Sequence, residues 1–200
     1  MAGNIPTIKE NSKNFKKFFK ETNFFIICPS NEINEFKEKL NSSNYNIIDE
    51  NTLITFEEFK NISNNFFKSN EFYNEIQDRL KWYYQQILKI SFLLNFILEK
   101  KEPILMWDAD TIILKPFNFF KKDFTIKYGT TFEFHRSYFE TNKIILGKLP
   151  EYFIASTNQF IGLTPSEGKF LIKKFENLRV KNTNLSSWIT EIIIDSISKS

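Results

Sequence analysis

The sequence predicts an α/β fold, and three observations lead to this prediction. Short apolar segments rich in Ile and Phe alternate with segments in which apolar residues recur every three or four positions. This alternation is typical of α/β domains. A length of 200 residues fits a single domain with a substantial core. Finally, the segment EPILMWDADTIIL, residues 102–114, runs from an apolar strand directly into a pair of aspartates.

The first hundred residues are predicted to contain three strands and three helices. Strands are expected over 4–9, 23–29 and 45–50, and helices from Asn11 or Ser12 to about Lys20, from Ser30 or Asn31 to about Leu40, and over 72–98. The last helix has apolar residues at intervals of three and four, which indicates one buried face.

The second half is predicted to begin with a strand over 103–107. A strand, a turn and the start of a helix are expected over 124–139, and a strand pair or a strand and turn over 152–164. Two helices follow, one over 165–178 and a final one over 186–197 with Ser186 or Ser187 as its cap. Because ligands of open α/β sheets bind at the carboxyl ends of strands, the end of the 103–107 strand is a suitable place for a site.

The composition excludes several classes of protein. A net charge of +3, from 27 basic and 24 acidic residues, argues against a dedicated nucleic-acid-binding protein. This net charge remains compatible with weak attraction to an anionic membrane surface. The single cysteine, Cys28, lies in an apolar run and is interpreted as a buried thiol. Without a disulfide or a hydrophobic signal region after Met1, the chain is expected to be cytoplasmic.

Asp108 and Asp110 are the strongest candidates for a functional site. Side chains two residues apart in a strand point the same way, so both carboxylates can face one cation. Mg²⁺ and Mn²⁺ prefer oxygen ligands and are commonly held by one or two carboxylates together with substrate phosphates. A turn rich in aspartate is the alternative. The pair therefore predicts a site for Mn²⁺ or Mg²⁺ and a phosphate group.

Two families place an Asp-x-Asp pair after an apolar strand. The haloacid-dehalogenase-like phosphatases are one, but they usually carry it on their first core strand and need a later acidic pair. The chain more closely resembles bacterial GT-A-type glycosyltransferases associated with capsule or lipopolysaccharide genes. The resemblance rests on four ordered motifs: RLKWYYQQILKI (79–90), MWDADTIILKPF (106–117), FEFHRSYFE (132–140) and ASTNQFIG (155–162).

The resemblance implies a fold and an activity. The fold would be a GT-A-like, Rossmann-like mixed sheet flanked by helices, with a nucleotide-binding half over 1–101 and a metal and acceptor half over 102–200. The donor would be a nucleotide-diphosphate sugar, and the acceptor a surface glycan or lipid-linked glycan at the cytoplasmic face, with peripheral membrane association. A non-catalytic nucleotide-sugar-binding domain of a larger protein is a further alternative. Since members usually carry more sequence after the last helix, truncation at the C-terminus is left open.

Several polar residues on the motifs are candidates for donor binding. The resemblance implies that Lys89 lies near the donor phosphates or sugar, and Gln86 and Arg79 could reach the donor from the same helix. Asn158 and Gln159 follow a run of small residues and could hydrogen-bond the hydroxyls of the sugar. For each of these residues an ordinary structural or solvated position is the alternative.

Two residues are candidates for catalysis. His135 is the only histidine and lies in the third motif, so it could act as a base or as a third metal ligand. Glu191 could be the general base of an inverting transfer, although its spacing also fits an ordinary amphipathic helix, which we favour.

The nucleoside of the donor is expected at the strand ends of the first half. Pro6 and Thr7 would lie at the end of the first predicted strand, and Asp49 or Glu50 at the end of the third.

Overall fold

The computed structural model describes residues 2–19, 23–40, 45–67, 73–116, 136–148 and 160–200. Short 3₁₀ turns cover Ala2–Asn4, Ser30–Glu32 and Glu50–Thr52. The helices and strands, in chain order, are α1 Ile5–Phe18, β1 Phe24–Cys28, α2 Ile33–Leu40, β2 Tyr45–Asp49, α3 Phe56–Phe67, α4 Tyr73–Lys100, β3 Ile104–Trp107, α5 Arg136–Leu146, β4 Phe160–Leu163, α6 Pro165–Leu178 and α7 Leu185–Ser198. The chain is therefore an α/β domain in which helices predominate, and the predicted class is confirmed.

The described strands form two separate pairs. β1 and β2 are parallel, with Cys28 opposite Asp49 at their carboxyl ends. β3 and β4 are antiparallel, and Trp107 at the end of β3 lies opposite Phe160. Within the described residues the two pairs share no ladder, so the single mixed sheet expected from the resemblance is not observed there.

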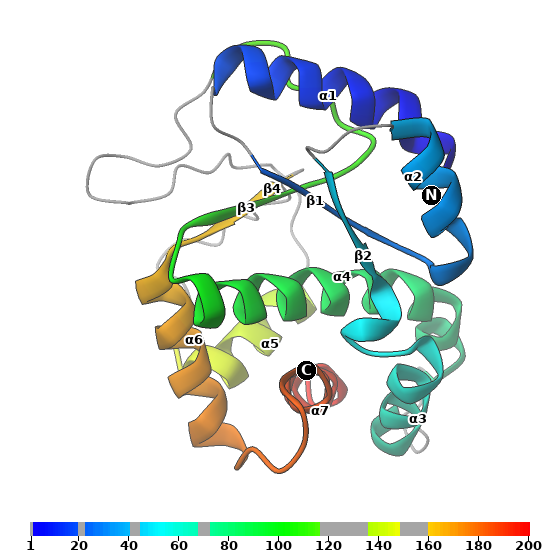
Figure 1. Ribbon diagram of the computed structural model, residues 1–200. Coiled ribbons are helices and arrows are strands. Elements are labelled where there is room, and N and C mark those ends of the chain that lie inside the picture. Colours follow the sequence, from blue (N-terminus) through cyan, green and yellow to red (C-terminus); the bar gives the residue numbers. More distant parts are fainter. Residues whose placement is uncertain (1, 20–22, 41–44, 68–72, 117–135, 149–159) are drawn as a thin grey trace.

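The long helix α4 organises the core. Figure 1 shows α4 (green) running across the molecule, with the strands and α1 on one side and α7 on the other. Leu93, Leu94 and Ile97 near its end pack in one cluster with Trp188 of α7. Leu80, Tyr84 and Ile87 nearer its start pack in a second cluster with residues of α3. The predicted helix over 72–98 is thus confirmed, and its buried face explains its apolar spacing.

The predicted strand over residues 4–9 is wrong, because this segment forms the beginning of α1. Pro6 lies in the first turn of the helix, where its fixed φ fits and its missing N–H has no helical partner to lose. Ile5, Ile8 and Phe15 then fall on the inner side of the helix at a helical spacing. The predicted cap at Asn11 or Ser12 is consequently seven or eight residues too late, because Asn4 is the N-cap.

Among the remaining predicted elements, most of those expected over 124–139 and 152–164 lie outside the described residues. β1, β2, β3 and α6 lie where they were expected. The final helix is capped by Asn184, whose side chain accepts a hydrogen bond from the Ser187 amide, and not by Ser186 or Ser187. α3 has no counterpart among the predicted elements. None of the described helices is both long and apolar enough to cross a membrane.

Candidate functional site

The aspartate pair forms a turn at the carboxyl end of β3. The strand ends at Trp107, and the amide of Thr111 donates to the carbonyl of Asp108 at 3.1 Å, which closes the turn. Asp108 is half-buried and Asp110 is exposed. The Thr111 hydroxyl lies 3.4 Å from a carboxylate oxygen of Asp110. Both aspartates therefore follow the end of the strand, where the sequence placed them, and they lie in a turn, the alternative stated above.

Lys89 reaches this turn from α4. Its ammonium nitrogen lies 2.5 Å from Oδ1 of Asp108, and the two side chains are 15% and 29% exposed. Such partial burial makes a charged pair stronger than one at the open surface. Within the described residues, this contact uses Oδ1 of Asp108. The structure therefore brings together a predicted phosphate-binding lysine and a predicted metal ligand.

Helix α1 holds the segment that follows the turn. The side-chain amide of Asn11 donates to the carbonyl of Thr111 and accepts from the amide of Ile113 at 2.9 Å. Asn14 adds a bond to the carbonyl of Ile113 at 3.0 Å. The indole nitrogen of Trp107 also donates to Thr111, at 2.7 Å. Four hydrogen bonds from two elements thus fix the backbone directly after Asp110.

Aromatic packing supports the same region. Phe15 of α1 meets Trp107 edge to face with ring centroids 5.3 Å apart, and Phe15 and Ile113 are the buried centre of a small cluster. The serine hydroxyl of Ser12 is hydrogen-bonded to the Tyr45 hydroxyl of β2. α1 therefore connects the strand that ends in aspartates with the parallel strand pair.

A second polar cluster lies at the carboxyl ends of β1 and β2. Asp49, the last residue of β2, accepts from the Ser30 hydroxyl at 2.7 Å and from the Asn51 amide at 2.9 Å. The side-chain amide of Asn51 donates in turn to Ser30 at 2.6 Å. Asp49 thus lies at a strand end, where the nucleoside was expected, and its carboxylate is held in a network of polar side chains.

The carboxylates of this cluster perturb their neighbours. Burial, together with Glu32, Asp49 and Glu50, raises the pKa of the Cys28 thiol to about 11. Burial, and then the neighbouring Asp49 and Glu32, also raises the pKa of Glu50 above its usual range. The end of the parallel pair is therefore a region of negative potential, which suits hydroxyl groups that donate hydrogen bonds and disfavours phosphates.

Arg79 and Gln86 lie on the same face of α4 as Lys89, since residues three, four and seven positions apart share a helix face. The guanidinium of Arg79 stacks over the exposed ring of Trp82 at 4.7 Å and lies 5.8 Å from the ring of Tyr83. Gln86 is half-buried. This face leads from the aspartate turn towards the start of α4.

The structure does not bring Glu191 to the aspartate pair. Its carboxylate accepts from the guanidinium of Arg179 at 2.6 Å, and Figure 1 draws α4 between α7 and the strands. The guanidinium also lies over the ring of Phe66 at 5.3 Å. These contacts favour the alternative that the sequence already offered, a residue of an ordinary amphipathic helix.

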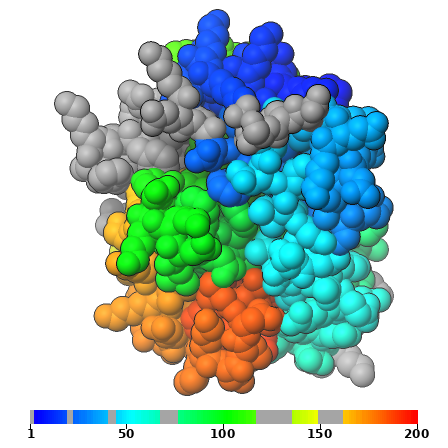
Figure 2. Space-filling view, viewed as in Figure 1, coloured from blue at the N-terminus to red at the C-terminus, as the bar shows by residue number. Residues whose placement is uncertain are grey.

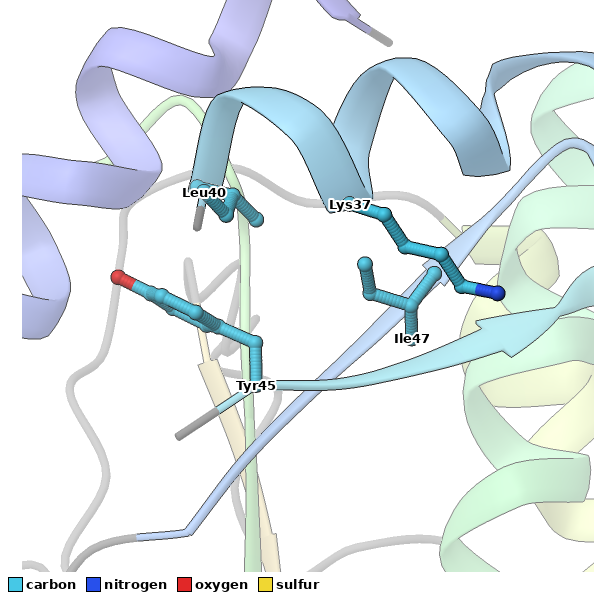
Figure 3. A pocket seen from close by; sticks show the side chains of 4 residues that line it. All are labelled: Lys37, Leu40, Tyr45 and Ile47. Carbon is cyan, nitrogen blue, oxygen red and sulfur yellow. The ribbon is translucent and has the colours of Figure 1, made fainter. Parts of the chain in front are cut away.

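Pro6 and Thr7 are also displaced from their expected place, because they belong to the first turn of α1 and not to a strand end. Pro6 borders an open hollow of about 470 Å³ between α1 and α2, together with Gly3, Ile5, Lys9 and Lys39. Figure 3 shows a smaller cavity, of about 130 Å³, between α2 and β2. It is lined by Lys37, Leu40, Tyr45 and Ile47, none of which was predicted to be functional.

Three predicted site residues, His135, Asn158 and Gln159, lie outside the described residues. Within the described ranges, no group of three His, Cys, Asp or Glu side chains gathers to hold a metal ion. Among the described residues, Asp108 and Asp110 therefore form a set of two candidate metal ligands without a third. A pair of carboxylates still fits Mg²⁺ or Mn²⁺, which commonly take one or two carboxylates and complete their shell with water and substrate phosphates.

Sequence reasoning missed Asn11 as a residue of the site. A weak signal was present, because Asn11 and Ser12 interrupt the apolar side of a helix that also carries Ile8 and Phe15, and buried polar side chains need partners. The partner, however, lies 100 residues away in the chain, and no local pattern identifies it.

The comparisons with known proteins add one finding. A family model described as a family of unknown function (DUF6492) matches residues 2–194. Neither a curated protein nor a solved structure matches the chain.

Proposed function

Because the chain belongs to the family DUF6492, whose function is not established, we propose an activity from its own residues: a metal-dependent glycosyltransferase that uses a nucleotide-diphosphate sugar. The observation that carries the proposal is the contact between Lys89 and Asp108, with Asp110 exposed beside it at the end of β3. A lysine ammonium group and two carboxylates at one strand end can form a binding site for a diphosphate and a divalent metal ion.

In this proposal Asp108 and Asp110 hold Mn²⁺ or Mg²⁺. The ion, when bound, neutralises the charge that grows on the leaving diphosphate. Lys89 supports the same charge and keeps the carboxylate of Asp108 in a fixed direction. Transfer breaks the bond between the sugar's anomeric carbon and the diphosphate oxygen, and the nucleoside diphosphate leaves with the bonding electron pair. The acceptor hydroxyl forms the new bond to that carbon, and its proton passes to solvent water. The acceptor is a surface or lipid-linked glycan.

The polar cluster around Asp49 would receive the nucleoside. Both clusters border α4: Tyr84 of this helix donates to the carbonyl of Ile54, which follows the Asp49 cluster in the chain, and Lys89 of the same helix contacts Asp108. A donor would place ribose hydroxyls at Asp49 and its diphosphate at Lys89. Gln86 and Arg79 would extend the donor site along α4.

The alternative phosphatase activity is weakened by one residue. The motif of the haloacid-dehalogenase-like enzymes has a threonine two positions after the second aspartate. In this chain Thr111 follows Asp110 directly, and Ile112 occupies that position. If the chain hydrolysed a generic phosphate ester with Mg²⁺, and Asp108→Asn abolished the hydrolysis, the phosphatase would replace our proposal.

The test is a calorimetric titration of the chain with nucleoside diphosphates, with and without Mn²⁺. We expect Asp108→Asn and Asp110→Asn each to weaken Mn²⁺-dependent nucleotide binding at least about tenfold, because each removes a charged oxygen ligand. Asp195→Asn is the matched control, since Asp195 of α7 pairs, within the described residues, with Lys199 directly after the helix. Equal binding by all three variants and the parent would contradict the metal site. Circular dichroism must first show that each variant is folded.

A further inference from the structure

The exposed side of α1 carries a cluster of lysines. Lys9, Lys13, Lys16 and Lys17 are all exposed, at relative positions i, i+4, i+7 and i+8. At 100° per residue these positions fall within an arc of about 100° on the helix, and they extend over about 12 Å of its length. The four ammonium groups therefore form one basic face, which we call the α1 lysine face.

This face accounts for the net charge of the whole chain. Helix α1 contains four lysines and one acidic residue, Glu10, which gives it a formal charge of +3. The complete chain also has a formal charge of +3, so the other residues sum to zero. The pairing with Glu10 is loose, at 4.0 Å from Lys13 and between exposed side chains. Positive charge is thus concentrated on one helix and balanced elsewhere.

The opposite side of α1 is fixed to the domain. Asn11, Ser12 and Phe15 are buried there and contact the segment after the aspartate turn and β2. The lysine face therefore has a defined orientation and points away from the core. Figure 1 places α1 at one end of the molecule, remote from α6 and α7, and Figure 2 shows its atoms (dark blue) at the outer edge.

We propose that the α1 lysine face docks on an anionic lipid bilayer. A charged helix lying flat on a surface can present all four ammonium groups to anionic headgroups at once, and each lysine near such a surface strengthens binding about fivefold. The Lys17 ammonium also lies 5.8 Å from the ring of the half-buried Phe18, an aromatic beside the basic face. Docking through this face is independent of the proposed transfer reaction.

The experiment is sedimentation with vesicles of phosphatidylcholine alone or with one third phosphatidylserine. The parent should bind only the anionic vesicles, and binding should weaken as the salt concentration rises. Removing three charges from the face, in the variant Lys13→Gln, Lys16→Gln and Lys17→Gln, should reduce binding at least about tenfold. These side chains are exposed, so the fold should be unaffected, which a melting curve verifies.

The matched control removes three lysines of α6, in the variant Lys169→Gln, Lys173→Gln and Lys174→Gln. It has the same net charge as the α1 variant but an intact lysine face, and it should bind like the parent. An equal loss of vesicle binding in both variants would show that binding depends on net charge alone. That result would overturn the proposal that the α1 lysine face docks. The proposal would also be overturned if the parent failed to bind anionic vesicles, or if it bound RNA and not lipid.

Discussion

At the scale of single residues, Asn11 shows how a side chain can replace part of a sheet. A side-chain carboxamide offers a carbonyl acceptor and N–H donors, the same kinds of group as a peptide unit. Asn11 uses both on the backbone of Thr111 and Ile113, which follow the end of β3. It thereby satisfies a buried amide and fixes the residues that follow Asp110.

We expect Asn11→Ala to lower the free energy of unfolding by about 2 kcal/mol, because the buried amide of Ile113 loses its acceptor. If the metal site is correct, Mn²⁺ affinity should fall as well. Urea unfolding and Mn²⁺ titration measure the two effects. Asn14→Ala is the control. Asn14 donates one hydrogen bond to a carbonyl, so its removal should lower the free energy of unfolding clearly less. Equal costs for both variants would contradict the role given to Asn11.

Cys28 gives a prediction about pH. Its side chain is fully buried, and its pKa is raised from 9.0 to about 11 in the folded chain. Between pH 9 and pH 11 the unfolded chain binds fewer protons at Cys28 than the folded chain does. The contribution of the protonated thiol to the free energy of unfolding, fully present below pH 9, should therefore be lost as the pH rises to about 11. The full loss corresponds to about 3 kcal/mol.

The measurement compares the parent with Cys28→Ala in urea unfolding from pH 8 to pH 11. The difference in unfolding free energy between the two should shrink at high pH, since only the parent carries the thiol. Other groups that titrate in this range are common to both proteins and cancel. A constant difference across the range would mean that the thiol keeps an ordinary pKa.

At the scale of elements, α4 and α6 approach each other closely at Gly168. A Cβ atom added to Gly168 would lie 2.8 Å from Cγ2 and 3.3 Å from Cδ1 of Ile97, which is itself 2% exposed. Closely packed interiors resist such insertions. The absence of a side chain at Gly168 therefore sets how near α6 can lie to α4, and with it the position of β4, which ends directly before α6.

Gly168→Ala should destabilise the fold by about 1 kcal/mol, because the overlap with Ile97 outweighs the higher helix propensity of alanine. In an Ile97→Ala background the overlap is gone, and the same change should become neutral or stabilising. Gly3→Ala, where an added Cβ meets nothing within 4 Å, is the control. Urea denaturation decides between these outcomes, and a Gly168→Ala cost that persists in the Ile97→Ala background would refute the contact.

At the scale of the whole molecule, two helices tie the core together. α4 contributes Leu94 to one cluster and Tyr84 to the other, and α7 likewise contributes Trp188 to the first and Ile194 to the second. Neither cluster can lose its packing without disturbing a helix that the other needs. We therefore expect the domain to unfold as one cooperative unit.

Tryptophan fluorescence can test this, because Trp107 packs against Phe15 of α1, while Trp188 of α7 is buried against Phe175 of α6. In the variant Trp82→Phe and Trp188→Phe, Trp107 is the single reporter, and in Trp82→Phe and Trp107→Phe it is Trp188. Within each variant, the fluorescence transition in urea should coincide with the loss of helical circular dichroism. Separate midpoints in either variant would show that the α1 region unfolds independently of the helical core.

The sequence by itself determined the α/β class, the long helix α4, the strand β3 and the place of the aspartate pair directly after it. These features are local: apolar spacing identifies a helix with one buried face, and an apolar run followed by acids identifies a strand end. The same local reasoning failed at residues 4–9, where Ile5 and Ile8 also fit a short strand. The segment is a helix because Pro6 fits its first turn and because a helix brings Ile5 and Ile8 into the same apolar cluster.

Only the tertiary structure decided which residues meet at the turn. The resemblance implied that Lys89 lies near the donor phosphates or sugar, but it did not predict the contact with Asp108. The bonds of Asn11 to Thr111 and Ile113 could not be foreseen either. Glu191 fitted a catalytic pattern, yet its partner is Arg179. The physical reason is the same in each case: a side chain's role depends on groups up to 100 residues away in the chain, and their proximity is set by packing, which leaves no periodic trace in the sequence.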